Sequence, residues 1–192
     1  MPLMESSSPG PNGQYLGALA WGLEFLGWRF TLPAKARITH IGGHLCAEHI
    51  GTGIFAALVE LKAAGPLPAF KISDVATTPD VRASVRFIPS RPSSQMLIPL
   101  AAPIELPAGT YGLVFGGADN AAQPPFTPFG VTGTALLPMN NQDHPNSFYF
   151  TGNIAGWKSL PAPANNLRFA LQWETVAGDQ TPPAPPTNLR IS

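Results

Sequence analysis

The chain has 192 residues, and only 11% of them are charged, where about 25% is usual for a globular protein. Lys+Arg and Asp+Glu balance at 11 each, which leaves no basic surface for nucleic acid and no polybasic patch for anionic lipid. The single cysteine excludes an intramolecular disulfide framework. With 23 prolines and 19 glycines, the composition favours one domain of many short strands joined by turns.

Residues 1–25 are interpreted as an N-terminal arm, because residues 1–13 have the Pro, Gly and Ser composition of a linker. They contain no basic segment followed by a continuous apolar stretch, so no secretory signal is expected. Residues 16–28 are the most apolar early stretch, but glycines interrupt them and they are too short to span a bilayer. We therefore expect synthesis in a cytoplasm without export, and no membrane partner.

Period-two alternation of apolar and polar residues is the dominant pattern that follows. Residues 26–32 alternate and predict a half-buried strand that stops at a proline. Residues 38–46 predict a second strand, in which the pair Gly42-Gly43 indicates a bulge or a sharp bend. Residues 54–61 are apolar on both faces, as expected of a central strand. Residues 81–87 alternate again, so one face of that strand is expected to be exposed to solvent.

The second half of the chain continues the strand pattern. Residues 96–106 predict a pair of strands broken around two prolines, and residues 111–115 alternate. The long segment 117–146 is predicted to be a loop with one short strand at 134–137. Loops of that length usually have a function or contact a partner. After a short strand at 148–150, residues 167–174 form the cleanest alternation in the chain.

These elements predict an all-β fold. The expected architecture is an antiparallel β-sandwich of about eight or nine strands, a jelly roll, covering residues 26–176. Residues 177–192, rich in proline, are interpreted as a C-terminal arm. The side chains expected to be almost fully buried between the sheets are Phe30, Val85, Phe87, Leu113, Phe115, Phe169 and Leu171.

Two segments carry a resemblance to known proteins. Residues 28–43 (WRFTLPAKARITHIGG) and 104–116 (IELPAGTYGLVFG) resemble the opening and late strands of accessory β-sandwich modules. Such modules occur in bacteriophage virion proteins and in bacterial surface proteins. Residues 185–191 are also similar to the first strand of a fibronectin type III domain. The resemblance implies a fold type and an accessory role, and it supplies no catalytic residues.

One short stretch gathers metal-ligand residue types, namely His40, His44, Cys46, Glu48 and His49. In a regular strand the even-numbered members would share one face and could converge on a metal ion. A cupin-like metal site would use the three histidines, but the His-any-His pair typical of cupins is missing. The alternative is a set of polar residues on an outward or interfacial strand face. We predict no bound metal and expect at least one of these side chains to point away.

Other catalytic patterns are missing from the sequence. It contains no Gly-any-Ser-any-Gly elbow, no phosphate loop and no suggestive carboxylate pair. The neighbours Asp143 and His144 lie in a turn-rich segment, where such a pair is common by chance. We therefore expect no catalytic residues and no cofactor. Tyr149 and Trp157 fall off the regular inward pattern, which makes them candidate contacts for a glycan.

These observations predict a non-enzymatic structural component of a virion, a capsid decoration or other accessory protein of a tailed bacteriophage. Its partners would be other virion proteins and copies of itself, clamped by the two arms. Ordering about 15 arm residues costs about 10–15 kcal/mol, which contacts with neighbouring subunits can supply. The apolar arm residues expected to make these contacts are Leu3, Met4, Tyr15, Leu16, Leu189 and Ile191.

Two alternatives stay open. The first is a carbohydrate-binding or adhesion module of a bacterial or phage surface protein, which would place the chain on a bacterial cell surface. The second is a metal-dependent cupin-like enzyme that uses the histidine-rich stretch.

Overall fold

The computed structural model describes residues 2–6, 25–47, 54–61, 80–89, 94–117, 134–136, 147–150, 158–159 and 168–176. Every regular element in these ranges is a β-strand, which confirms the predicted all-β class. No helix in this part of the chain is long and apolar enough to cross a membrane. The strands are β1 (Leu3–Glu5), β2 (Phe25–Leu32), β3 (Ala36–Ala47), β4 (Ile54–Glu60), β5 (Val81–Phe87), β6 (Ser94–Leu106), β7 (Gly109–Gly117), β8 (Thr134–Leu136), β9 (Ser147–Phe150), β10 (Lys158–Ser159) and β11 (Phe169–Thr175).

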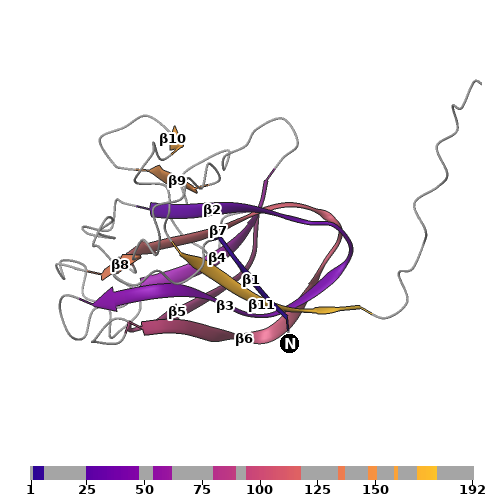
Figure 1. Cartoon of the computed structure of the whole chain (residues 1–192), viewed down its shortest axis with the longest axis horizontal. Coiled ribbons are helices and arrows are strands. Elements are labelled where there is room, and N and C mark those ends of the chain that lie inside the picture. The colour runs from indigo at the N-terminus through magenta and orange to yellow at the C-terminus, as the bar shows by residue number, and fades with distance from the viewer. Residues whose placement is uncertain are drawn as a thin grey trace, which may run out of the picture.

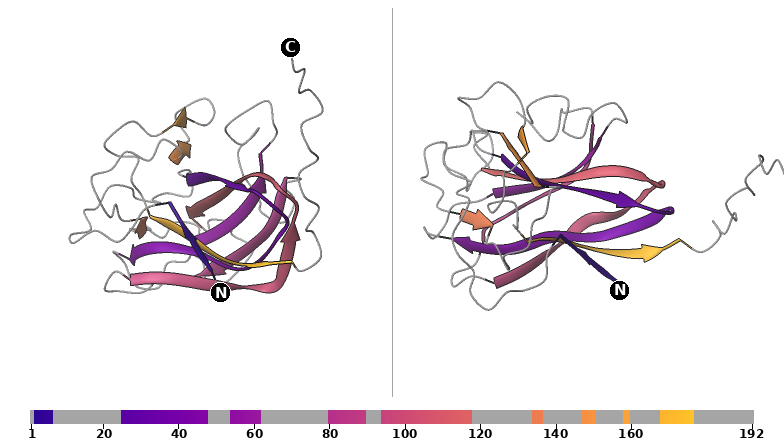
Figure 2. Two further views of the ribbon diagram at one scale, coloured as in Figure 1. Left: turned by 45° about the vertical axis from the view of Figure 1, so that its right-hand side comes forward. Right: turned by 45° about the horizontal axis from the view of Figure 1, so that its top comes forward.

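The strands form two antiparallel sheets that lie face to face, as the right view of Figure 2 shows. Sheet A has the order β1-β11-β3-β6, and β8 pairs with the end of β3. Sheet B has the order β10-β9-β2-β7-β4-β5. On one side of the sandwich the edge strands β5 and β6 lie next to each other (Figure 1). The predicted β-sandwich is therefore confirmed.

A folded two-stranded ribbon joins the two sheets. In sheet B, β2 pairs with β7 along its whole length and ends at the pair Leu32–Gly109. In sheet A the same two chain segments pair again as β3 and β6, starting at Ala36–Leu106. Short turns carry both segments from one sheet to the other at the same end of the sandwich (Figure 2). A ribbon folded over in this way is typical of a jelly roll.

The main core lies between the sheets. Five of the side chains expected there are 0–4% exposed, namely Phe30, Leu113, Phe115, Phe169 and Leu171. The expectation was wrong for Val85 and Phe87, which are only partly buried against the core. Both lie on β5, the edge strand of sheet B, and an edge strand has a packing neighbour on one side only.

A second apolar cluster lies on the other face of sheet B. Its members alternate with core residues along the strands and are 0–6% exposed: Phe25, Phe55, Ala57, Val59 and Val114. The rings of Phe25 and Phe55, with centroids 5.8 Å apart, meet over Gly116. A Cβ at Gly116 would lie 2.4 Å from Phe25 Cδ1 and 2.6 Å from Phe55 Cε1. Only glycine therefore fits between these two rings.

Two strand irregularities differ from the expectations. Gly42 and Gly43 pair regularly, and the register shift of β3 lies instead between Ile38 and His40. Gly42 serves close strand approach, because a Cβ there would lie 1.8 Å from the carbonyl oxygen of Met96 on β6. The expected break around the two prolines lies in the pairing of β6 and not in the strand itself, since β6 runs as one strand while its ladder with β3 passes from Pro99 to Ile104. That strand accommodates them by the same register shift opposite Thr39.

Candidate functional site

A buried arginine lies on the outer face of sheet A. Arg168 directly precedes β11 and is only 2% exposed. Phe169 and Leu171 point into the core, so the pleat directs Arg168 and Ala170 to the opposite face. On this face, the neighbouring cross-strand pair is formed by two small residues, Ala170 and Gly42. They leave room for the long side chain of Arg168.

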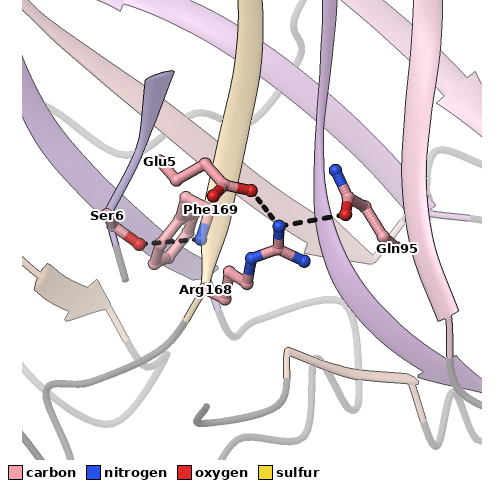
Figure 3. Close-up of polar contacts among 5 residues, drawn as sticks. All are labelled: Glu5, Ser6, Gln95, Arg168 and Phe169. Carbon is pink, nitrogen blue, oxygen red and sulfur yellow. Dashed lines mark hydrogen bonds and ion pairs between the residues drawn. The ribbon is translucent and has the colours of Figure 1, made fainter. Parts of the chain in front are cut away.

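The guanidinium of Arg168 connects two strands that are not adjacent. Its Nη2 donates hydrogen bonds to Oε1 of Glu5 on β1 and, at 2.9 Å, to Oε1 of Gln95 on β6 (Figure 3). The Glu5 side chain is 23% exposed and the Arg168 side chain 3%, so this ion pair is largely shielded from water. Burial lowers the pKa of Arg168, yet an arginine stays protonated in proteins. The Glu5 carboxylate supplies the opposite charge that a buried cation requires.

Backbone bonds complete the attachment of the N-terminal strand to β11. Leu3, Met4 and Glu5 pair with residues 170–172 in an antiparallel ladder. The Ser6 amide donates to the carbonyl of Phe169 at 3.0 Å, and the Phe169 amide donates to Oγ of Ser6 at 2.8 Å. At the other end of the ladder, the Trp173 amide donates to the carbonyl of Pro2 at 3.2 Å.

This attachment corrects one expectation about the N-terminal arm. Leu3 and Met4 were expected on a segment without a strand partner in its own chain, and that was wrong. Met4 packs against the domain core, whereas Leu3 is 40% exposed. The reason is tertiary, because the partner strand β11 lies at the other end of the sequence. The remaining arm candidates Tyr15, Leu16, Leu189 and Ile191 lie outside the described residues.

The predicted histidine cluster is spread along β3. His40 and His44 both occupy the outer face, but four residues of a strand separate their Cα atoms by about 13 Å. Nδ1 of His40 lies 3.0 Å from Oγ1 of Thr39. Burial lowers the pKa of His44, whose amide donates to the carbonyl of Arg168 at 3.1 Å. Among the described residues, no three His, Cys, Asp or Glu side chains form a metal-binding group.

The remaining sequence candidates are placed only in part. Cys46 pairs through its backbone with Ala135, but its side chain and all of His49 lie outside the described part. Tyr149 belongs to β9 and pairs with Leu26, again without a described side chain. Trp157 lies outside the described residues. The expectations of no metal and of a glycan contact therefore both stay predictions.

A second polar group surrounds the turn between β6 and β7. The hydroxyl of Tyr111 donates to the carbonyl of Pro107 at 3.0 Å, as in the tyrosine corner of Greek-key sandwiches. Burial raises the pKa of Tyr111. Next to it, a hydrogen bond from Arg82 to Glu60 raises the pKa of the arginine. An open hollow of about 510 Å³ lies over Glu60, Leu61 and the turn. The Glu60 carboxylate accepts a hydrogen bond from Arg82, and the Tyr111 hydroxyl donates one to Pro107. These contacts stabilise the turn.

The residues of the Arg168 site were not singled out from the sequence. Arg168 is one of several polar residues in the alternation around β11, and alternation alone predicts that it faces water. The informative signal would have been a carboxylate able to reach it, but Glu5 is separated from it by most of the chain. No protein-family model matches this chain, and no curated protein matches it either.

Proposed function

We propose that this chain is a non-enzymatic structural protein that joins an assembly through the β1–β11 edge of sheet A. The assembly we propose is a virion, in which the protein serves as a capsid decoration or accessory protein of a tailed bacteriophage. The single observation that carries the proposal is that the first described strand, β1, pairs with the last described strand, β11, at this edge. The Trp173 amide donates to the carbonyl of Pro2, so the start of β1 lies next to the C-terminal half of β11.

The edge has the physical properties of an attachment surface. A strand at the edge of a sheet carries one row of backbone groups directed away from the sheet, which another chain can pair with. Leu3 adds an exposed apolar side chain, at 40% exposure. The low charge of the whole chain, 11%, gives weak protection against association, as expected of a protein that works beside copies of itself.

The experiment is to delete residues 179–192 and to measure both association and stability. We expect the native protein to have a mass in solution that is a multiple of 20.3 kDa by light scattering. The deletion should leave the melting temperature unchanged, because β11 ends at Thr175. It should weaken association, because an arm that orders on binding makes its contacts only in the assembly.

Three outcomes would contradict the proposed function. A deletion that lowers the melting temperature and leaves association intact would mean that the C-terminal arm folds onto its own domain. A protein that is monomeric at all concentrations and binds glycans would favour the carbohydrate-binding alternative. The virion assignment requires the chain in particles purified from cells that carry its gene, at a fixed copy number per capsid. Particles without the chain would refute it.

A further inference from the structure

We propose that β1 is exchanged between copies of this chain. Leu3–Glu5 of one copy would form the edge strand of sheet A in a second copy, and its Glu5 would bind Arg168 of that copy. This inference rests on the proposed function, because it identifies the N-terminal arm as the element that clamps a neighbouring subunit. The partner is therefore a second copy of this chain.

Strand β1 forms a separable unit at the edge of sheet A. Its backbone ladder and the backbone bonds of Pro2 and Ser6 join it to β11, and Glu5 pairs with Arg168, directly before β11. Met4 also packs against the domain core. A strand at the end of a sheet can be replaced by an identical strand that makes the same contacts. No other strand of sheet A has to move.

The place of β1 on β11 is costly to leave empty. Without Glu5, the cation of Arg168 would remain at a position where its side chain is 3% exposed. Removing one partner of such a buried pair is strongly destabilising. The backbone of β11 would also become an open sheet edge. An occupant must therefore be a strand with a carboxylate at this position, and every copy of this chain carries one.

This place can be filled by β1 of the same chain or by β1 of a second copy. A β1 from a second copy has the same sequence and makes the same contacts, so exchange loses none of them. Residues 7–24 connect Ser6 to β2, and a chain of that length extends to about 60 Å. A domain of this size has a radius of gyration of about 16 Å. The connection is thus long enough to reach an adjacent copy, whose place for β1 is held close by the assembly itself.

The pair Leu3–Gln172 allows a direct test by disulfide formation. The hydrogen bond from Trp173 to Pro2 makes the next pair along, Leu3–Gln172, a non-hydrogen-bonded one. The Cα atoms of such a pair lie about 4.5 Å apart, within the range for a disulfide. In a Cys46→Ser background, the variants Leu3→Cys and Gln172→Cys are refolded together at equal concentration and then oxidised. The control replaces Gln172→Cys by Thr31→Cys, an exposed position on sheet B.

Exchange predicts a disulfide-linked pair of chains on a non-reducing gel for up to about half of the chains, the fraction that random mixing of two variants allows, and at least tenfold less for the control. The double variant with both cysteines in one chain should form linked oligomers. Internal disulfides alone, together with an oligomeric mass by light scattering, would refute exchange and leave the proposed function standing. A monomeric mass at every concentration would refute both.

Charge reversal provides a second, independent readout. In exchanged copies of one variant, Glu5→Arg or Arg168→Glu brings like charges together between neighbouring chains, so each variant alone should associate at least tenfold more weakly. In a mixture of the two, exchange restores opposite charges at both sites, and association should recover. A mixture that associates no better than either variant alone would overturn the proposal.

Discussion

Glu5→Gln is the substitution that most sharply tests the role of the N-terminal strand. It keeps the size of the side chain but removes the charge that balances Arg168. Breaking a fully buried ion pair costs about 3–5 kcal/mol. Because the Glu5 side chain is 23% exposed and Gln95 still accepts a hydrogen bond, we expect about 2–3 kcal/mol here.

The assay is urea unfolding at a fixed protein concentration, with thermal unfolding beside it. A loss of about 2–3 kcal/mol corresponds to a fall in melting temperature of about 4–12 °C for a chain of this length. Arg168→Met in the Glu5→Gln background completes a double-mutant cycle. The double variant should cost less than the sum of the two single variants, because it leaves no buried charge without its partner.

The matched control is Glu105→Gln, at the pair that Glu105 forms with Lys35 at 2.7 Å. There the two side chains are 37% and 50% exposed. This control should cost clearly less than Glu5→Gln, because solvent screens an exposed ion pair. If Glu5→Gln costs no more than Glu105→Gln, or if the cycle is additive, the Arg168 site contributes nothing to holding β1.

Three further predictions concern the domain itself. Leu171→Ala should cost about 2–5 kcal/mol in urea unfolding, and Val85→Ala clearly less, because only the first side chain is fully buried; equal costs would contradict the core assignment. Gly42→Ala should cost at least about 1–3 kcal/mol by the same assay, since its Cβ would meet the Met96 carbonyl, and a neutral result would refute that close approach. Because the pKa of His44 is lowered from 6.5, the unfolded chain binds a proton that the folded chain resists, so stability should fall as the pH drops below about 6.5. His44→Gln should flatten this part of the pH profile, and an unchanged profile would contradict it.

Alternation of apolar and polar residues predicted much of the sandwich, for a physical reason. Each of β2, β7 and β11 has one face on the core, so its inward residues repeat at every second position. Strand β4 was predicted as central from its two apolar faces, and it packs against the core on one and the second cluster on the other. The burial of β5 was overestimated, because alternation does not distinguish an edge strand from a central one.

What escaped prediction depends on contacts between distant parts of the chain. Strand β1 has three residues in a segment of linker-like composition, and it exists because the edge of β11 accepts it. The register shift at Thr39 follows from matching three strands, β3, β6 and β11, and no local pattern marks it. Arg168 has the sequence context of a solvent-facing residue, and its burial depends on Glu5 and Gln95 meeting it from two other strands.

The central claim is that copies of this chain associate through the β1–β11 edge of sheet A. An experimental structure of the protein in its associated form tests it most directly. We expect an interface of more than about 1,000 Å² that includes Leu3–Glu5 and β11. An interface of that size elsewhere, with the β1–β11 edge left open to solvent, would contradict the claim.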